Sequence, residues 1–356
     1  MARSRAPSKR RSSVLTTAFK ALAVATAVIA LALAVYLYWA WHRPLDPGAD
    51  TYVVRPGTSL RGLAAQLRER GVLRETRSFV FLGYITGRSR ALKAGEYRFR
   101  AGMSAGELLD QVVAGRVVEY PFIIVEGWSF HQVRQALANT PKLTQTLTGV
   151  GNDEIMRRLN RPGVHPEGRF FPDTYYFSTE YTDLAILGRA LEKMETRLAQ
   201  EWGSRAADLP LRSADEALTL ASIVEKETSR PEERRLIAGV FINRLRKGMR
   251  LQTDPTVIYG LGPTFDGNIR LKDLRADTPY NTYTRAGLPP TPIAMPGGAS
   301  LAAALHPADT PALYFVSRGD GTHVFSATIA EHNAAVVKYQ LGGKTPQQRT
   351  TGDKKK

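Results

Sequence analysis

The 356-residue sequence contains no cysteine. This absence excludes disulfide frameworks, cysteine nucleophiles and thiolate metal sites, because each of them needs a thiol. The H-E-x-x-H spacing, in which two histidines on one helix bind zinc, is also missing. We therefore expect neither a metal nor another cofactor.

Acidic residues are absent from the N-terminal end of the chain. Residues 1–20 contribute +6 to the formal net charge of +16, residues 344–356 contribute +4, and all the residues between them contribute the remaining +6. Charge that gathers at the two ends indicates a topology signal and a solvated tail rather than a nucleic-acid groove. We predict basic tails at 1–20 and 342–356, the second of them disordered, and no nucleic-acid partner.

Residues 21–41 lack charge altogether. As a helix they would extend about 31 Å, which matches the hydrocarbon thickness of a bilayer. The positive residues precede this run, so we expect a single-pass transmembrane helix with its amino terminus in the cytoplasm. A cleaved signal peptide would have a shorter apolar region and a small-residue cleavage site. Here the run ends in aromatic residues that favour the membrane–water interface: Tyr36, Tyr38, Trp39 and Trp41.

Residues 42–50 are rich in Pro, Gly and Asp and predict a short linker. After it, an extended run followed by Gly-x-Ser occurs three times, with an apolar residue four positions beyond Ser59, Ser104 and Ser129. The pattern predicts a strand, a glycine turn and a serine that caps the next helix. The first copy resembles a LysM module, a βααβ unit that binds N-acetylglucosamine chains. We predict a LysM-like α/β subdomain over residues 51–137, with a packing domain that binds no ligand as the alternative.

The second copy, residues 102–106, also matches the G-x-S-x-G nucleophile elbow of serine hydrolases. The other two copies keep the serine without the second glycine. Helix capping explains all three copies, so we do not expect Ser104 to be a nucleophile.

Helical periodicity returns in the second half of the chain. It predicts helices over 185–202, over 214–228 with Ser213 as the cap, over 232–246, and near 330–339. Between the third and fourth of these helices, the chain is rich in Gly, Pro, Thr and Asn up to residue 298. A segment of that length is too long for an ordinary surface loop, so we expect it to build a binding surface.

The helix over 214–228 carries a glutamate on its apolar side. Glu227 falls within about 20° of Leu220, inside the apolar stripe, whereas Glu225 lies at the edge of that stripe. A carboxyl group on an apolar face has a raised pKa and can donate a proton near neutral pH. The alternative is an ordinary surface glutamate at a helix end.

Several long motifs closely resemble the MltG (YceG-like) endolytic murein transglycosylases. They are A-S-I-V-E-K-E-T at 221–228, V-F-I-N-R-L at 240–245 and the run at 249–260. Shorter motifs agree as well, and the match covers residues 20–340. They lie at 167–175, 280–283, 287–290, 306–307, 323–325 and 331–333.

The resemblance implies that Glu227 is the catalytic residue of a lyase. It implies endolytic cleavage of the N-acetylmuramic acid–β-1,4–N-acetylglucosamine bond in nascent strands, leaving 1,6-anhydro ends and terminating strand elongation. It also implies a location at the cytoplasmic (inner) membrane with the catalytic domain outside, and cell-wall synthases as candidate partners. The expected fold is α+β, with a helical lysozyme-like catalytic domain at 161–341 that contains a β-containing insertion.

A glycan groove needs amides for the N-acetyl groups and flat rings against the sugars. The sequence candidates for substrate binding are Gln252, Thr253, Asp254, Tyr280, Asn281 and Tyr283. Asp254 or Glu225 as a second carboxylate would instead make the enzyme a muramidase that uses water. A non-catalytic peptidoglycan-binding scaffold is the alternative from another class.

Overall fold

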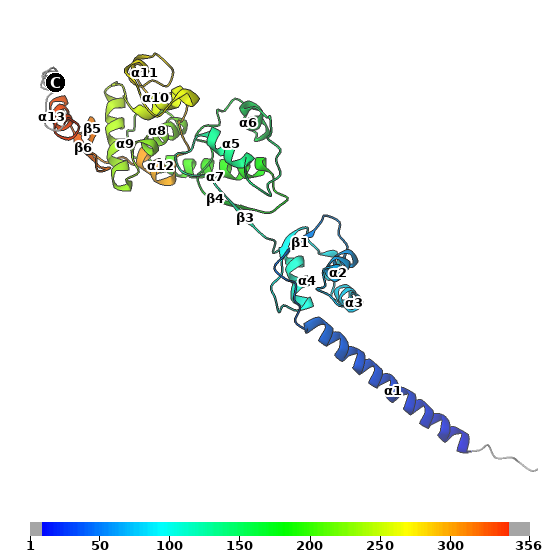
Figure 1. Cartoon of the computed structure of the whole chain (residues 1–356). Helices are drawn as coiled ribbons and strands as arrows, with labels where there is room; N and C mark the ends of the chain where they lie inside the picture. Colours follow the sequence, from blue (N-terminus) through cyan, green and yellow to red (C-terminus); the bar gives the residue numbers. More distant parts are fainter. Residues whose placement is uncertain (1–8, 342–356) are drawn as a thin grey trace, which may run out of the picture. The chain divides into compact units, whose positions relative to one another are not determined.

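The computed structural model describes the chain from Lys9 to Leu341, without the side chains of residues 9–15. The predicted tail at 342–356 and the first eight residues of the predicted N-terminal tail lie outside the described residues. The chain divides into two compact units, one ending at Glu119 and the other beginning at Tyr120, whose elements are labelled in Figure 1. The mixed helix-and-strand class predicted from the sequence is confirmed.

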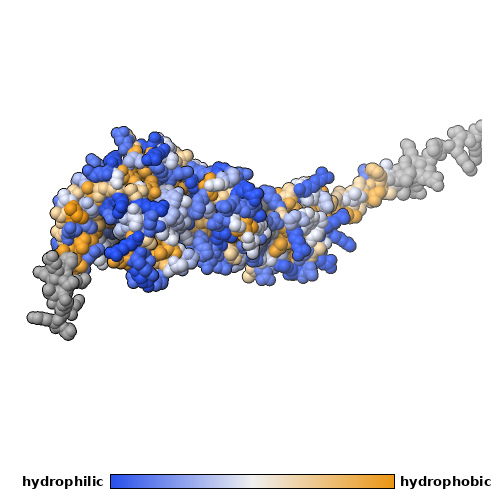
Figure 2. Space-filling model, turned by 90° about the horizontal axis from the view of Figure 1, so that it is seen from above, coloured by the Kyte–Doolittle hydropathy of each residue, from blue (hydrophilic) through white to orange (hydrophobic). Residues whose placement is uncertain are grey.

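The first element is one unbroken apolar helix, α1 (Lys9–His42). Its segment Thr16–His42 has the length and composition of a membrane span, and the predicted span at 21–41 lies inside it. The helix begins within the predicted basic tail, so only part of that tail precedes it. Large apolar side chains such as Leu22 and Ile29 are exposed along it. Figure 2 shows them as the narrow orange stretch beside the grey N-terminal residues.

The rest of the first unit surrounds a small two-stranded sheet. β1 pairs antiparallel with β2, with Tyr52 opposite Tyr97. Between the strands lie two helices and a 3-10 turn, so the order agrees with the predicted βααβ unit, and a further helix follows. The elements are β1 (Thr51–Val54), α2 (Leu60–Glu69), α3 (Arg77–Ile85), η1 (Arg88–Arg90), β2 (Gly95–Arg98) and α4 (Ala105–Ala114).

The three Gly-x-Ser serines cap helices, as predicted. The hydroxyl oxygen of Ser59 accepts the backbone N–H of Gly62 at the start of α2. Ser104 and Ser129 each form a capping box with the residue three positions later, at the starts of α4 and α5. The second glycine of G-x-S-x-G has a separate reason, because a Cβ at Gly106 would overlap the indole of Trp41. The motif is therefore a cap followed by a close helix contact.

The predicted linker at 42–50 is packed rather than free. Leu45 donates its backbone N–H to the carbonyl of Met103 at 2.8 Å, and its own carbonyl accepts from Gly102 at 2.8 Å. Its side chain is 5% exposed and belongs to the core of the first unit. A Pro- and Gly-rich composition indicates irregular backbone, but it does not show that such backbone is unattached.

The second unit begins earlier than the predicted subdomain boundary at residue 137. β3 (Tyr120–Ile123) pairs antiparallel with β4 (Thr174–Phe177). The helices α5 (Phe130–Ala138) and α6 (Asn152–Arg158) pack on the same core as the start of α7 (Asp183–Gly203). The third Gly-x-Ser copy therefore belongs to the second unit, because its strand β3 pairs with the distant strand β4.

The centre of the second unit is α8 (Ala214–Glu227), with Ser213 as its cap, as predicted. It packs against α7, α9 (Pro231–Arg246) and α12 (Gly298–Leu305). All residues from Ala217 to Val224 are buried, including Ser222. The sequence predicted that only one side of this helix is buried, but other elements cover this stretch of α8 on every side. The buried Ser222 hydroxyl is accommodated because it bonds to backbone atoms.

The segment between α9 and α12 forms helices and loops, and strands return after α12. Its elements are α10 (Asp254–Leu261), the 3-10 turn η2 (Gly262–Thr264) and α11 (Leu271–Arg275). After α12, β5 (Tyr314–Ser317) pairs antiparallel with β6 (His323–Ser326), and α13 (Ile329–Tyr339) packs on this hairpin.

Candidate active site

Glu227 is the last residue of α8, at the point where the buried helix reaches a pocket. Burial raises the pKa of its carboxyl to about 7, and the nearby charge of Asp254 acts in the same direction. The Thr253 hydroxyl donates a hydrogen bond to Oε1 of Glu227, which lowers the pKa. Glu227 thus has the environment of an acid that holds a proton near neutral pH.

The pocket beside Glu227 has a volume of about 390 Å³ and is formed by several parts of the second unit. They are the end of α8, Arg244 of α9, the loop before α10, Asp254 at the start of α10, Tyr283, the β5–β6 hairpin and α13. Three of the residues predicted to bind substrate line it together with Glu227: Gln252, Asp254 and Tyr283.

These three residues come from two neighbouring segments, one before and at the start of α10 and the other after α11. Gln252 has a positive φ of 50° and an exposed side chain. Its backbone N–H donates to the carbonyl of Thr282 at 3.1 Å. The Tyr283 hydroxyl donates to the exposed carboxylate of Asp254 at 2.6 Å. The two segments therefore present an amide, a carboxylate and an aromatic ring to the pocket.

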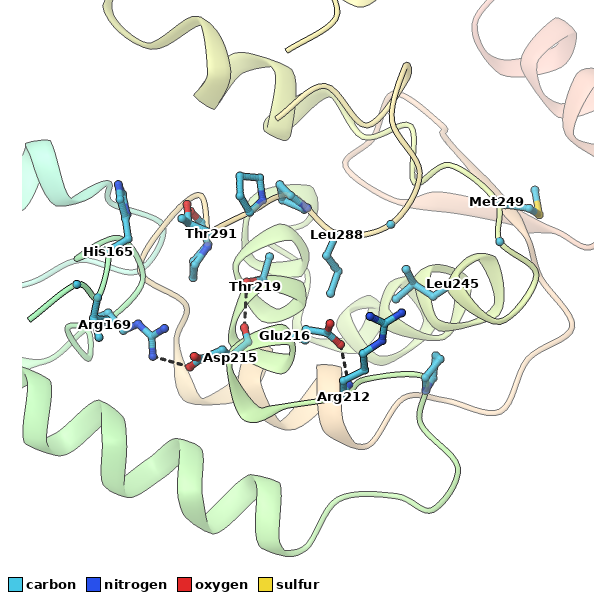
Figure 3. A pocket seen from close by; sticks show the side chains of 18 residues that line it. His165, Arg169, Arg212, Asp215, Glu216, Thr219, Leu245, Met249, Leu288 and Thr291 are labelled. Carbon is cyan, nitrogen blue, oxygen red and sulfur yellow. Dashed lines mark hydrogen bonds and ion pairs between the residues drawn. The ribbon is translucent and has the colours of Figure 1, made fainter. Parts of the chain in front are cut away.

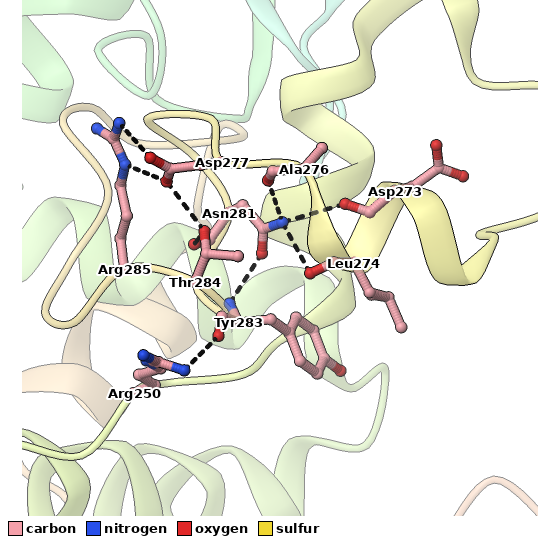
Figure 4. A network of polar contacts seen from close by, with 9 residues as sticks. All are labelled: Arg250, Asp273, Leu274, Ala276, Asp277, Asn281, Tyr283, Thr284 and Arg285. Carbon is pink, nitrogen blue, oxygen red and sulfur yellow. Dashed lines mark hydrogen bonds and ion pairs between the residues drawn. The ribbon is translucent and has the colours of Figure 1, made fainter.

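The other three predicted substrate-binding residues occupy different positions. Thr253 is 2% exposed and lies behind Glu227 as its hydrogen-bond donor. Asn281 is 1% exposed, and its side-chain amide donates to the carbonyls of Asp273, Leu274 and Ala276. Its oxygen accepts from the backbone of Tyr283. Figure 4 shows that Asn281 joins its own loop to the end of α11.

Tyr280 lines a second pocket, of about 750 Å³, together with the buried Glu167. Its hydroxyl bonds to Thr291 at 2.8 Å, and its ring packs against Tyr259. Glu167 accepts the backbone N–H of Phe130 and the hydroxyl of Tyr259, and burial raises its pKa to about 7. The predicted loop 280–283 thus contributes to two separate pockets.

Sequence reasoning missed several residues that surround Glu227, namely Arg244, Tyr314 and His332. The Arg244 guanidinium donates to the carbonyls of Leu313 and Leu251 and lies 5.2 Å from the Tyr314 ring. Arg244 and His332 belong to motifs that the sequence singled out, at 240–245 and 331–333. Tyr314 comes from a segment that no motif or periodicity links to α8.

Two histidines from the motifs at 306–307 and 323–325 occupy different positions. His323 lines the Glu227 pocket, whereas His306 lies at the end of α12 with its Nε2 3.8 Å from Glu201. Among the residues that the structure describes, no group of three or more His, Asp or Glu side chains is arranged to hold a metal ion.

Glu225, the other carboxylate of the E-K-E run, faces away from this pocket. It accepts the backbone N–H of Gly297 at 2.9 Å and pairs with Arg234 at 3.5 Å. Its side chain is 6% exposed. These contacts give it a role in joining α8 to α9 and to the start of α12.

A further pocket, of about 800 Å³, lies where residues 163–169 and the loop 287–292 meet the start of α8. Both of its carboxylates have partners: Asp215 contacts Arg169 at 2.6 Å, and Glu216 accepts the backbone N–H of Arg212 (Figure 3). Size alone therefore does not identify the reactive site.

A protonated carboxyl group that opens on a polar, aromatic-lined pocket defines a site for acid–base chemistry. The matches to known proteins define the family. The model of the YceG-like family matches residues 52–338. The endolytic murein transglycosylase of Bacillus subtilis is 33% identical over 316 residues, covering 83% of this chain and 87% of the relative. The chain belongs to the YceG-like family.

Two other similar proteins extend the comparison. The endolytic murein transglycosylase of Streptococcus pneumoniae strain D39 is 27% identical, and the match covers 83% of this chain and 60% of that relative. A crystal structure of a YceG-like protein from Listeria monocytogenes aligns with a TM-score of 0.51 at 31% identity. That alignment covers 81% of this chain and 99% of the other.

Proposed function

We propose that this protein is a lytic murein transglycosylase that cuts glycan strands internally at the N-acetylmuramic acid–β-1,4–N-acetylglucosamine bond. The observation that carries the proposal is the buried Glu227, which has a pKa of about 7 and lines a polar pocket. Relatives that share most of the chain are named endolytic murein transglycosylases. The names of the relatives support a lyase, and the buried acid supports an enzyme rather than a non-catalytic scaffold.

Glu227 is the proposed general acid. In its protonated form it donates a proton to the leaving glycosidic oxygen, and the C6 hydroxyl of the same muramyl residue attacks the anomeric carbon. The product is a 1,6-anhydro end, and no water is added. The C6 hydroxyl must lose its proton to a base, and the newly formed Glu227 carboxylate is the acceptor in a scheme with a single carboxyl group.

Gln252, Asp254 and Tyr283 are the proposed sugar-binding residues, because they line the pocket with Glu227. Thr253 and Asn281 support them from behind, and Tyr280 would contact a more distant part of the strand through the second pocket. A helical, lysozyme-like arrangement of the second unit around α8 is part of the same proposal.

The first unit is the proposed LysM-like glycan-binding part. The order β1-α2-α3-β2 supports this, as does a pocket of about 810 Å³ between α2 and α3. Phe81 and Tyr84 line that pocket, and each is 50% exposed. In a Glu227→Gln background, replacing Tyr84 by Ala should weaken binding to purified sacculi. Unchanged binding would favour a packing unit that binds no glycan.

The proposed location is the cytoplasmic membrane, with the N-terminus inside and both units outside. The positive charges before α1 and its apolar length support this orientation. A reporter fused after Lys356 should be active only on the outer side, and activity in the cytoplasm would contradict both the orientation and the substrate. Such an enzyme would meet strands as they are made, so cell-wall synthases are the proposed partners, to be tested by crosslinking in intact cells.

Mass spectrometry of the fragments released from sacculi tests the reaction. Anhydro-muramyl ends are the expected product. Reducing muramyl ends would instead indicate a muramidase that uses water, with Asp254 as the candidate second carboxylate. No release by the folded protein would indicate a scaffold.

A further inference from the structure

His323 is held in a fixed orientation by Glu233. Its backbone N–H donates to Oε1 of Glu233 at 2.8 Å, and its ring Nδ1 lies 2.7 Å from Oε2. Glu233, on α9, is 8% exposed. Both oxygens of one buried carboxylate therefore engage one residue of β6, and this fixes the rotation of the imidazole.

The His323 ring lines the same 390 Å³ pocket as Glu227. The side chain is 14% exposed, and its ring packs edge to face on Phe315 with 5.5 Å between centroids. Because Nδ1 is directed at Glu233, the opposite edge of the ring, which carries Nε2, is turned away from that carboxylate. Within residues 9–341, Nε2 makes no protein hydrogen bond.

The carboxylate also selects the tautomer. An ionised Glu233 can only accept hydrogen bonds, so Nδ1 must carry the proton of a neutral imidazole. The lone pair is then on Nε2. A histidine whose Nδ1–H is held by a carboxylate and whose Nε2 is bare has the arrangement of a general base.

We propose that His323 is the base that takes the proton of the C6 hydroxyl, with Glu233 as its positioning residue; the inference rests on the proposed transglycosylase function. Nε2 accepts the hydroxyl proton as O6 forms a bond to C1. The bond from C1 to the leaving oxygen breaks, and that oxygen takes the proton of Glu227. The step ends with an anionic Glu227 and a cationic His323, and proton transfer from His323 to Glu227 through solvent restores both.

This division of roles predicts a bell-shaped dependence of kcat/KM on pH. The alkaline limb belongs to Glu227, which must keep its proton to act as the acid. The other charged or titratable groups around the pocket lie on α9, α10, the 281–284 loop, β5 and α13. They are Arg244, Asp254, Tyr283, Tyr314 and His332.

The first test is His323→Ala in the full-length protein. We expect kcat to fall by at least about 10²-fold with little change in KM, since a general base contributes about 10²–10⁴ in rate. Added imidazole should restore part of the rate, and the restored rate should follow the concentration of neutral imidazole. The matched control is His306→Ala, a histidine near a carboxylate but outside the pocket, which should retain the wild-type rate.

The second test separates positioning from packing. Glu233→Gln can direct its amide N–H at Nδ1 and so move the proton of His323 to Nε2, which blocks the base. Glu233→Asp keeps a carboxylate. We expect Glu233→Gln to lose most of kcat and Glu233→Asp to retain much more of it, with the melting temperature of each variant reporting its folding.

The outcomes distinguish the two proposals. If the wild-type protein releases no anhydro ends, the proposed function itself fails. If it releases them, a wild-type rate in His323→Ala overturns the base assignment alone. So does loss of rate that imidazole does not restore, or an equal loss in both Glu233 variants.

Discussion

Thr253 and Glu227, 26 residues apart in the chain, are joined by a hydrogen bond from the threonine hydroxyl to the carboxyl Oε1. Thr253 is fixed in turn, because its backbone N–H donates to the Thr282 hydroxyl at 3.0 Å. Burial raises the pKa of Glu227 and this hydrogen bond lowers it. Their balance sets the pH range in which the acid has a proton to give.

Glu227→Gln should abolish the release of anhydro ends. The substitution keeps the shape of the side chain but removes the transferable proton, and the loss of a general acid costs about 10²–10⁴-fold in rate. Fragment release from sacculi is the measurement. Glu232→Gln, on the exposed first turn of α9, is the control and should remain active. Near-normal release by Glu227→Gln would refute the assignment of this residue.

Thr253→Val should move the alkaline limb of kcat/KM to higher pH. Valine has the same shape but cannot donate, so the pKa of Glu227 rises and the acid stays protonated over a wider range. The expected displacement is on the order of one pH unit. Thr264→Val, at an exposed position in η2, is the control. A limb that stays in place would show that the hydrogen bond has no influence on the acid.

Stability should fall as the pH rises from about 4.5 to about 7. Burial raises the pKa values of Glu167 and Glu227 from 4.5 to about 7, so between these values the folded protein binds more protons than the unfolded chain. The contribution of these two groups to the free energy of unfolding therefore decreases over that window, by roughly 3 kcal/mol for each group, and does not change above it.

Glu167→Gln isolates one of the two groups. The variant cannot ionise, so its melting temperature should drop less than that of the wild type between pH 5 and pH 8. Thermal unfolding of the detergent-solubilised protein at both values is the measurement. An identical drop in the two proteins would contradict the raised pKa of Glu167.

Glu225→Gln should affect stability rather than chemistry. It removes the charge that faces Arg234, whose side chain is only 11% exposed, and should cost roughly 1–3 kcal/mol in unfolding free energy. Turnover per folded molecule should remain close to wild type. Glu192→Gln, exposed on α7, serves as the control for the loss of one negative charge. A folded but inactive Glu225→Gln protein would require a second essential carboxylate.

Ser104→Ala should lower the stability of the first unit by about 0.5–2 kcal/mol, because the N-cap of α4 is lost. Ser104→Thr should retain most of that stability, since threonine also caps helices. Both folded variants should cleave glycan at the wild-type rate. Complete loss of turnover in a folded Ser104→Ala protein would favour the nucleophile reading of the G-x-S-x-G motif.

The features predictable from the sequence were the local ones. Ser59, Ser104, Ser129 and Ser213 all cap the helices expected of them, because a cap depends on backbone within one turn. The burial of Glu227 followed from helical periodicity. Both depend on interactions that a short stretch of chain makes with itself.

The composition of the pocket was beyond such reasoning. Periodicity describes the faces of one helix but does not say which other elements will cover them. Tyr314 and His323 reach Glu227 only because the β5–β6 hairpin packs beside α9. Asn281 shows the opposite case: its residue type suited a sugar ligand, yet its amide donates to two carbonyls of α11 and to that of Ala276.

Trp41 of α1 packs against Gly106 of α4, and Leu45 forms backbone hydrogen bonds with Gly102 and Met103. These contacts connect α1 rigidly to the rest of the first unit. A transmembrane helix joined to a domain by a flexible linker leaves that domain free to rotate. Here any tilt of the helix in a bilayer would be passed on to the β1–β2 sheet, and local membrane thickness would set the height at which the first unit stands. An insertion within residues 42–50 would therefore disrupt the packing of Leu45 in the core of the first unit rather than move that unit farther from the membrane.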